Sequence, residues 1–274
     1  MNKATNVLSV EEAAAQAPYP LFVPFIMAGD PDEEATISIA LSLQEAGAHI
    51  LELGIPYSDP LADGPLLQRS AQRALKGGMS LKGALRMIRT MRERGLTIPV
   101  VVFSYVNPVL RMGEETFVKE AASAGANGVL IPDLPMEESS FISELAREKE
   151  LSVISLVAPT SAHRIEKIAS QAQGFLYCVS SLGVTGTRDA FPDEAYAFIR
   201  KVKEASTVPV AVGFGISNRR QVELLDGVSD GIVVGSAIMK IVEQEQEALV
   251  SAEKTEREQA LNEIKTFVSG LISS

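Results

Sequence analysis

Short apolar runs alternate with longer amphipathic segments along this chain, and the alternation repeats about eight times. A run such as Val100 to Phe103 is hydrophobic at every position, which is typical of parallel strands that are covered on both faces. The pattern therefore predicts parallel strands at Leu21 to Met27, His49 to Gly54, Pro99 to Ser104, Gly128 to Ile131, Ser152 to Val157, Gly174 to Ser180, Val208 to Gly213 and Gly231 to Gly235.

The amphipathic segments between these runs carry the signals of helix ends. The acidic stretch Asp30 to Glu34 is suited to a helix N-terminus, and Gly47, Gly95 and Gly125 stand where helices should stop. The predicted helices are Asp32 to Ala46, Ser80 to Arg94, Glu114 to Ala124, Met136 to Lys149, Ser161 to Gln173, Pro192 to Ala205 and Asn218 to Asp226.

Strand–helix units that follow one another without a linker favour a single (β/α)₈ barrel domain over residues 1–274. An extra helix near Ser9 to Ala17 precedes the first strand, and a helical extension from Ala252 to Leu271 follows or extends the last unit. A doubly wound open sheet is the alternative that fits the same alternation.

Composition and charge argue against several classes of protein, among them nucleic-acid-binding, membrane-bound and disulfide-stabilised proteins. The net charge of −10 disfavours nucleic acid or an anionic membrane as the main partner, because both require basic patches. The single cysteine, Cys178, excludes a disulfide framework and suits a reducing compartment. We see no signal peptide and no apolar run long enough to span a membrane, so the cytoplasm is expected. His49 and His163 lie away from the strand ends that form the expected site, and no metal-ligand spacing is present.

Two carboxylates flank a proline-framed turn directly after the second predicted strand. Glu52 lies at the end of an apolar strand, where a carboxylate costs several kcal/mol unless it is paired, protonated or used. Asp63 follows in the segment Pro56 to Pro65. This pair suggests acid–base chemistry. The alternative is that Glu52 is a solvated strand-end residue and Asp63 forms an ordinary Asp-Gly turn.

The carboxyl ends of the strands in a barrel share one rim, where barrel enzymes place their active sites. Glycine-rich ends follow the last two predicted strands, and their backbone N–H groups could hold a phosphate without a lysine. These ends contain Gly213, Gly215, Gly235 and Ser236, which could also be plain turns and a helix cap. Asp30, Tyr105, Asn107, Asp133 and Tyr177 also lie at strand ends.

Two further segments at this rim have both a functional and an ordinary interpretation. The loop Ser180 to Arg188 is rich in glycine and small polar residues, so it could close over a ligand or be a surface loop. Prolines stiffen the turn Pro132 to Pro135 around Asp133, so it could receive another protein or simply turn the chain.

Several motifs together resemble the α subunit of tryptophan synthase over essentially the full chain. They are Pro24 to Pro31, Glu52 to Pro65, Pro132 to Glu138, Gly183 to Gly186 and Gly213 to Ser217. The resemblance implies a TIM barrel that cleaves indole-3-glycerol phosphate by a retro-aldol reaction to indole and glyceraldehyde 3-phosphate. It implies no cofactor and no metal. The pair Ser181-Leu182 departs from the family pattern, which bears on loop closure rather than on the chemistry.

The resemblance also implies residue roles. Glu52 would be the acid–base residue, and Asp63 would hold the indole N–H and stabilise its growing charge. Thr185 would pack against Asp63 when the loop closes. The indole pocket would comprise Phe25, Phe103, Leu130, Leu156, Tyr177 and Phe214, and the phosphate site Gly186, Gly213, Gly215, Gly235 and Ser236.

A partner is implied as well: the pyridoxal-phosphate β subunit, in an α2β2 tetramer. The turns at Pro56 to Pro60, Asn107-Pro108 and Pro132 to Pro135 would face it.

Three alternative functions remain. A stand-alone indole-3-glycerol-phosphate lyase would keep every catalytic residue. Another phosphate-binding barrel aldolase or isomerase should carry a lysine or other base in place of Glu52 and Asp63. A non-catalytic barrel that only activates a partner should lack one of the two.

Overall fold

A single parallel sheet organises the computed structural model, which describes residues 7–179, 192–213 and 215–273. The strand order is β5-β4-β3-β2-β1-β9-β8-β7-β6, and every pairing is parallel. The strands are β1 (Leu21–Met27), β2 (Leu51–Gly54), β3 (Val100–Phe103), β4 (Gly128–Leu130), β5 (Ser152–Val153), β6 (Ser155–Val157), β7 (Leu176–Val179), β8 (Val210–Gly213) and β9 (Gly231–Val234).

The two ends of this sheet belong to one continuous stretch of chain. We expected one strand over 152–157, and that prediction was wrong in detail, because Ile154 interrupts it. β5 pairs with β4, whereas β6 pairs with β7. The Ile154 N–H still donates to the carbonyl oxygen of Val129 at 2.9 Å. The segment thus passes from one neighbour to the other and closes the sheet into a nearly complete barrel, which excludes the open doubly wound sheet.

The helices follow the strands as the periodicity predicts, with small shifts at their ends. They are α1 (Val10–Gln16), α2 (Glu33–Glu45), α3 (Pro65–Lys76), α4 (Leu81–Glu93), α5 (Val106–Met112), α6 (Glu114–Ala124), α7 (Ser140–Glu148), α8 (Ile165–Ala169), α9 (Asp193–Ala205), α10 (Arg219–Leu224), α11 (Ser236–Gln244), α12 (Gln246–Leu249) and α13 (Lys254–Ile272), with 3₁₀ turns η1 (Met136–Glu138) and η2 (Pro159–Arg164). The expected helices 136–149 and 161–173 were therefore too long. Each begins as a 3₁₀ turn, and α8 also ends at Ala169, four residues before the predicted end.

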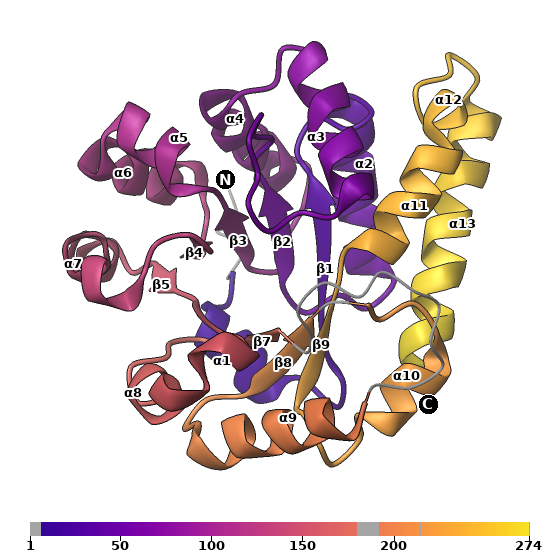
Figure 1. The fold of residues 1–274 in the computed structure, drawn as a ribbon. Coiled ribbons are helices and arrows are strands. Elements are labelled where there is room, and N and C mark those ends of the chain that lie inside the picture. The colour runs from indigo at the N-terminus through magenta and orange to yellow at the C-terminus, as the bar shows by residue number, and fades with distance from the viewer. Residues whose placement is uncertain (1–6, 180–191, 214, 274) are drawn as a thin grey trace.

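Two helices were not foreseen from the alternation of runs. α3 and α5 come directly after the loops that leave β2 and β3, whereas α11 begins at Ser236, where a helix start was expected after the last strand (Figure 1). α3 and α5 are insertions at the carboxyl rim of the barrel. The unit that follows β2, for example, contains α3 as well as the outer helix α4.

Two apolar clusters fill the barrel and its surroundings. The larger cluster lies between the strands and the outer helices, and the smaller one fills the barrel interior and includes Val10, Ala13 and Ala14 of α1. α1 is close enough that a Cβ at Gly174 would lie 2.6 Å from Val10. The extra N-terminal helix therefore closes the amino end of the barrel.

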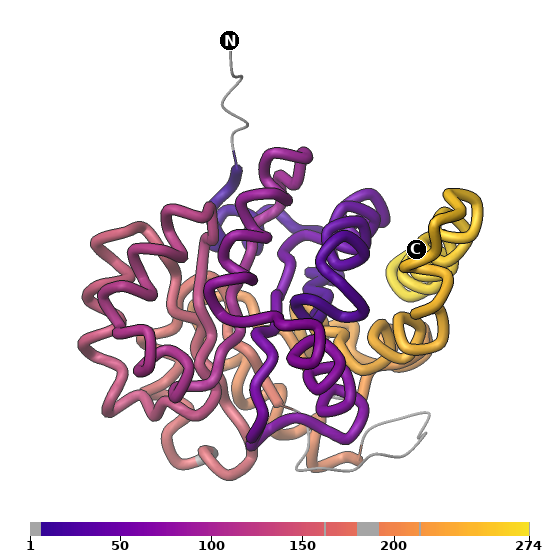
Figure 2. The backbone as a smooth tube through the Cα atoms, turned by 90° about the horizontal axis from the view of Figure 1, so that it is seen from above, coloured from indigo at the N-terminus to yellow at the C-terminus, as the bar shows by residue number. Residues whose placement is uncertain are grey.

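The C-terminal helices pack on the outside of the barrel. α13 contacts α2, and Figure 2 places the yellow C-terminal helices beside the indigo segment that contains α2. None of the helices within the described residues is both long and apolar enough to cross a membrane.

Candidate active site

Glu52 is the second of the four residues of β2. Its residue is 2% exposed, and it is in register with Phe25 on β1 and with Val101 on β3. Among the described residues, its Oε1 atom has no hydrogen-bond partner. Burial, with a contribution from the charge of Asp63, raises the pKa of Glu52 to about 8. A buried carboxyl group whose Oε1 finds no partner in the described part of the chain fits a chemical role better than a structural one.

Asp63 lies on the loop that links β2 to α3, and neighbouring groups hold it on both sides. The buried Tyr105 hydroxyl accepts the Ala62 N–H at 3.0 Å, and its hydrogen-bonding interaction with the Asp63 side chain favours the ionised carboxylate. Gln68 of α3 donates from Nε2 to the Asp63 carbonyl oxygen at 2.8 Å. Burial raises the pKa of Asp63 to about 6, and the Tyr105 hydrogen bond opposes that rise.

The two carboxyl groups therefore differ in charge at neutral pH. With pKa values of about 8 and about 6, Glu52 is mostly protonated while Asp63 is mostly ionised. Two carboxyl groups whose environments separate their pKa values can act as a proton donor and as an electrostatic stabiliser. The sequence had identified Tyr105 only as a strand-end residue, and its contact with Asp63 depends on the tertiary structure.

Apolar and aromatic side chains surround this pair. Phe25 and Phe103 meet edge to face with ring centroids 5.7 Å apart, and Phe103 meets Tyr105 in the same way at 5.9 Å. The expected pocket residues Phe103, Leu130, Leu156 and Tyr177 belong to or pack against the interior cluster. Burial raises the pKa of Tyr177 well above its usual value, so this phenol stays neutral. Phe214 lies outside the described residues.

The glycines at the rim have a packing role that sequence reasoning missed. A Cβ at Gly213 would lie 2.5 Å from the Tyr177 ring, and a Cβ at Gly235 would lie 3.2 Å from Phe25. These glycines therefore make room for the pocket aromatics Tyr177 and Phe25. Gly215 has φ of +84°, which favours glycine. Ser236 begins α11 and is exposed.

The remaining expected site residues, Thr185 and Gly186, fall with the loop Ser180 to Arg188 outside the described residues.

The three turns expected to face a partner are linked to one another at this rim. Asn107 donates from Nδ2 to the Tyr57 hydroxyl at 2.9 Å, and the Val106 N–H donates to Asp133 Oδ1 at 2.9 Å. Asp133 therefore supports the first turn of α5. Two large apolar side chains of this region are exposed, Leu61 by 82% and Leu110 by 55%.

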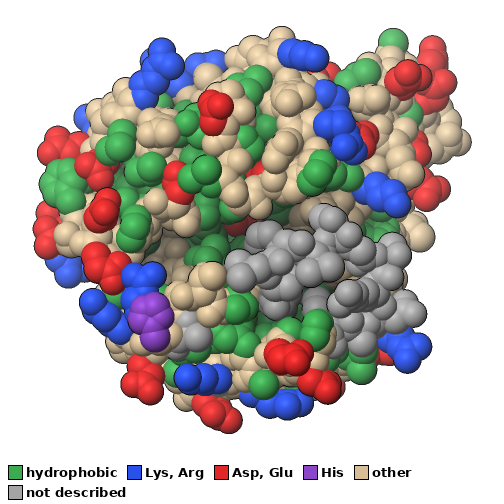
Figure 3. Space-filling view, in the orientation of Figure 1, with side chains coloured by type: hydrophobic (Ala, Val, Ile, Leu, Met, Phe, Trp, Pro, Cys, Tyr) green, Lys and Arg blue, Asp and Glu red, His purple; other side chains and the backbone are tan. Residues whose placement is uncertain are grey.

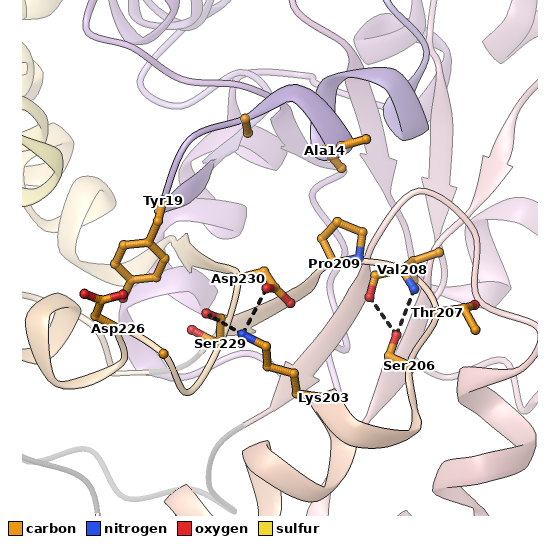
Figure 4. Close-up of a pocket in the computed structure, with 13 residues that line it drawn as sticks. Ala14, Tyr19, Lys203, Ser206, Thr207, Val208, Pro209, Asp226, Ser229 and Asp230 are labelled. Atoms are coloured by element: carbon orange, nitrogen blue, oxygen red, sulfur yellow. Dashed lines mark hydrogen bonds and ion pairs between the residues drawn. The ribbon is translucent and has the colours of Figure 1, made fainter.

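Other surface features suggest no chemistry. Charged side chains of both signs are scattered over the face shown in Figure 3. A hollow of about 540 Å³ lies at the amino ends of β1, β8 and β9 (Figure 4). Its one lysine, Lys203, pairs with Asp230 at 3.1 Å. In the described part of the chain, no three His, Cys, Asp or Glu side chains are grouped so that they could hold a metal ion.

A nearly closed parallel barrel with two neighbouring carboxyl groups of raised pKa at its carboxyl rim is typical of one class, the (β/α)₈-barrel enzymes. The family model described as "Tryptophan synthase alpha chain" matches residues 12–269. This chain belongs to the tryptophan synthase α chain family.

Individual relatives agree with that assignment. The chain is 57% identical over 263 residues to the tryptophan synthase α chain of Halalkalibacterium halodurans, covering 96% of this chain and 98% of the relative. It is 52% identical over 256 residues to that of Bacillus subtilis, covering 92% and 95%.

Solved structures give the same result. A chain of the tryptophan synthase α2β2 complex from Pyrococcus furiosus superposes with a TM-score of 0.82 at 37% identity, covering 91% of this chain and 96% of that chain. The α chain from Legionella pneumophila superposes with a TM-score of 0.81 at 32% identity, covering 96% and 93%.

Proposed function

We propose that Glu52 and Asp63 carry out the reaction of this family in this chain, with Glu52 as the acid–base residue. The chain is a carbon–carbon lyase of tryptophan biosynthesis that cleaves indole-3-glycerol phosphate to indole. The observation that supports the residue roles is the isolation of Glu52: its carboxyl group is buried at a strand end and lacks a hydrogen-bond partner at Oε1 among the described residues.

The proposed cleavage uses the Glu52 carboxyl group twice. The protonated acid first donates its proton to indole C3, which leaves a positive charge on the ring nitrogen. The resulting carboxylate then takes the proton of the hydroxyl group next to C3. As the aldehyde C=O forms, the carbon–carbon bond breaks and its electron pair returns to the ring, giving indole and glyceraldehyde 3-phosphate. These steps require no cofactor.

Asp63 would stabilise the charge that appears between the two proton transfers. Its carboxylate can accept the indole N–H and offset the positive nitrogen. The hydrogen bond from Tyr105 supports this role, because it favours the ionised form of Asp63.

The substrate would lie between two binding regions. Phe25, Phe103, Leu130, Leu156, Tyr177 and Phe214 are the proposed indole pocket. Gly186, Gly213, Gly215, Gly235 and Ser236 are the proposed phosphate site, with Thr185 on the closing loop. The start of α11 at Ser236 supports a phosphate there, since a helix N-terminus attracts anions.

A β subunit is the proposed partner. The Pyrococcus furiosus relative was described as part of an α2β2 complex with mutual activation. The linked turns that contain Tyr57, Asn107 and Asp133, together with exposed Leu61 and Leu110, support a docking face at the same rim. We also infer that the chain works as one domain in the cytoplasm, which the buried free Cys178 supports.

Glu52→Gln tests the catalytic assignment. The amide should fold and bind substrate but release indole more slowly by at least about 10² to 10⁴-fold, because it can neither protonate C3 nor accept the hydroxyl proton. Single-turnover indole formation measures the effect. Glu34→Gln, at an exposed ion pair with Arg94, is the matched control and should behave like the parent. Activity of Glu52→Gln within tenfold of the parent would remove Glu52 from the mechanism.

A further inference from the structure

Two helices at the rim, α3 and α11, are joined by an ion-pair network. Arg73 of α3 donates from Nη1 to Glu243 Oε1 of α11 at 2.6 Å. Arg69, one turn earlier on α3, donates to both oxygens of Glu243 at 3.0 and 2.7 Å. Both arginines lower the pKa of Glu243 to about 2, so the network keeps its charges across the physiological range.

The network continues to a buried carboxylate after β1. Arg73 donates two hydrogen bonds of 2.8 Å to Asp30, from Nε to Oδ1 and from Nη2 to Oδ2. The Ser70 hydroxyl also donates to Asp30. Asp30 is 1% exposed, so Arg73 is the cation that makes a buried charge tolerable there. One guanidinium thus ties α3 to the loop after β1 and to α11.

Each of the two joined helices holds one end of the proposed substrate site. α3 begins two residues after Asp63, and its Gln68 holds the Asp63 carbonyl oxygen. α11 begins at Ser236, beside the close approach of Gly235 to Phe25. The substrate must reach from Asp63 to the phosphate site. The separation of these two ends therefore depends on how α3 is seated against α11.

We propose that Arg73 is a positioning residue that sets the separation between Asp63 and the phosphate-binding end of α11, by joining α3 to Glu243 and to Asp30. This inference rests on the proposed function. It can be tested separately. Loss of the ion pairs should not change the affinity for a ligand that contacts only one end of the site, whereas it should slow the reaction of a substrate that spans both ends.

Glu243→Gln is the first test, because it removes the charge of Glu243 and one of the two oxygens that accept from Arg69 and Arg73. It therefore weakens the link between α3 and α11 and leaves the buried Arg73–Asp30 pair intact. We expect kcat for indole-3-glycerol phosphate to fall by about tenfold or more, since small misplacement of reacting groups can cost up to about 10²-fold. The dissociation constants of glycerol 3-phosphate and of indole, each measured alone by calorimetry, should stay within about twofold of the parent.

Substitutions of Arg73 extend the test. Arg73→Gln should reduce kcat further, and it should lower the unfolding midpoint because Asp30 loses its cation. Arg73→Lys should recover part of the loss, because an ammonium keeps the charge but lacks the planar fork that reaches both carboxylates. Arg94→Gln removes an exposed arginine from a carboxylate pair elsewhere and should leave kcat unchanged. All assays are run where circular dichroism shows each variant folded.

Two outcomes would overturn the inference. One is a folded Glu243→Gln chain with the kcat of the parent. The other is a loss of glycerol 3-phosphate affinity in proportion to the loss of kcat/KM, which would mean that the network builds the phosphate site itself. Failure of the proposed function would look different, because Glu52→Gln would then keep activity within tenfold of the parent, whatever Glu243→Gln does.

Discussion

At the scale of single residues, the main feature of the site is that burial raises the pKa values of two similar carboxyl groups by different amounts. Glu52 sits inside a strand end and Asp63 on a loop with a hydrogen-bond donor, so their pKa values separate to about 8 and about 6. A carboxylate in an apolar strand could be identified from the sequence as unusual. The difference between the pKa values of Glu52 and Asp63 could not be identified in this way, because it depends on neighbours that come from other strands.

The pKa values predict a bell-shaped dependence of kcat/KM on pH. Activity should rise as Asp63 ionises near pH 6 and fall as Glu52 loses its proton near pH 8. Tyr105→Phe removes a hydrogen bond to the ionised form of Asp63, so the acidic limb should move to higher pH and the bell should narrow. Steady-state kinetics between about pH 5 and 9 measure both limbs.

Asp63→Asn is the control for that assignment. It should abolish the acidic limb and shift the alkaline limb to lower pH, since the charge that helps to raise the pKa of Glu52 is gone. An acidic limb that stays in place in Asp63→Asn would assign it to another group.

At the scale of elements, insertions at the rim separate this barrel from a plain alternation of strands and helices. Periodicity predicted α2, α4, α6 and α9 within a residue or two, because each buries one continuous face. It did not predict α3. This helix lies at the rim, and its position relies on hydrogen bonds from Arg73 to Asp30 and Glu243, partners distant in sequence.

The start of α11 gives a prediction for phosphate binding. Gly235→Asp should weaken the affinity for glycerol 3-phosphate by at least about tenfold, because a carboxylate at the helix start repels the ligand. Gly235→Ala introduces the same Cβ beside Phe25 without a charge, so it isolates the steric contribution and should cost much less. Calorimetric titration compares the two. Equal affinities for both variants would locate the phosphate elsewhere.

At the scale of the whole molecule, the two ends of the barrel have different tasks. The proposed catalytic residues lie at the carboxyl rim. The amino end contains side chains that connect several segments by hydrogen bonds, and Arg92 is an example. This guanidinium donates to the carbonyl oxygens of Gly125, Leu96 and Ile98 and to Asn127 Oδ1 over 2.7 to 3.1 Å. Burial lowers the pKa of Arg92 to about 10, which still leaves it charged at neutral pH.

Arg92→Met should therefore lower the free energy of unfolding by about 2 kcal/mol or more, because several partly buried acceptors lose their donor. Catalysis should be unaffected in the folded fraction. Urea denaturation measures the change, and Arg89→Met, at an exposed position of the same helix, is the control. A loss no larger than that of Arg89→Met would mean that water replaces the guanidinium at no cost.

The partner interaction also belongs to this scale. A matching β subunit should accelerate indole release at least about tenfold, by ordering the turns around Asp63 and excluding water. Amide exchange at Tyr57 to Asp63 should slow when β is added. Leu110→Asp should reduce the acceleration, whereas Val250→Asp, at an exposed apolar position on the loop between α12 and α13, should keep it. A chain that is equally fast alone and gains no protection would be the stand-alone lyase.

The sequence by itself determined the alternation of parallel strands and helices, the order of these units and the two carboxylates, because these follow from local periodicity and from residue types. It favoured a barrel, but only the pairing of β5 with β4 and of β6 with β7 excluded an open sheet. The nearly unbroken apolar runs allow little besides strands covered on both faces. Only the tertiary structure decided which groups touch: Tyr105 with Asp63, Gly213 with the Tyr177 ring, and Arg73 with both Asp30 and Glu243. These contacts join segments up to 170 positions apart in the chain, so no local pattern can encode them. They exist because closing the sheet brings the carboxyl ends of all its strands to one rim.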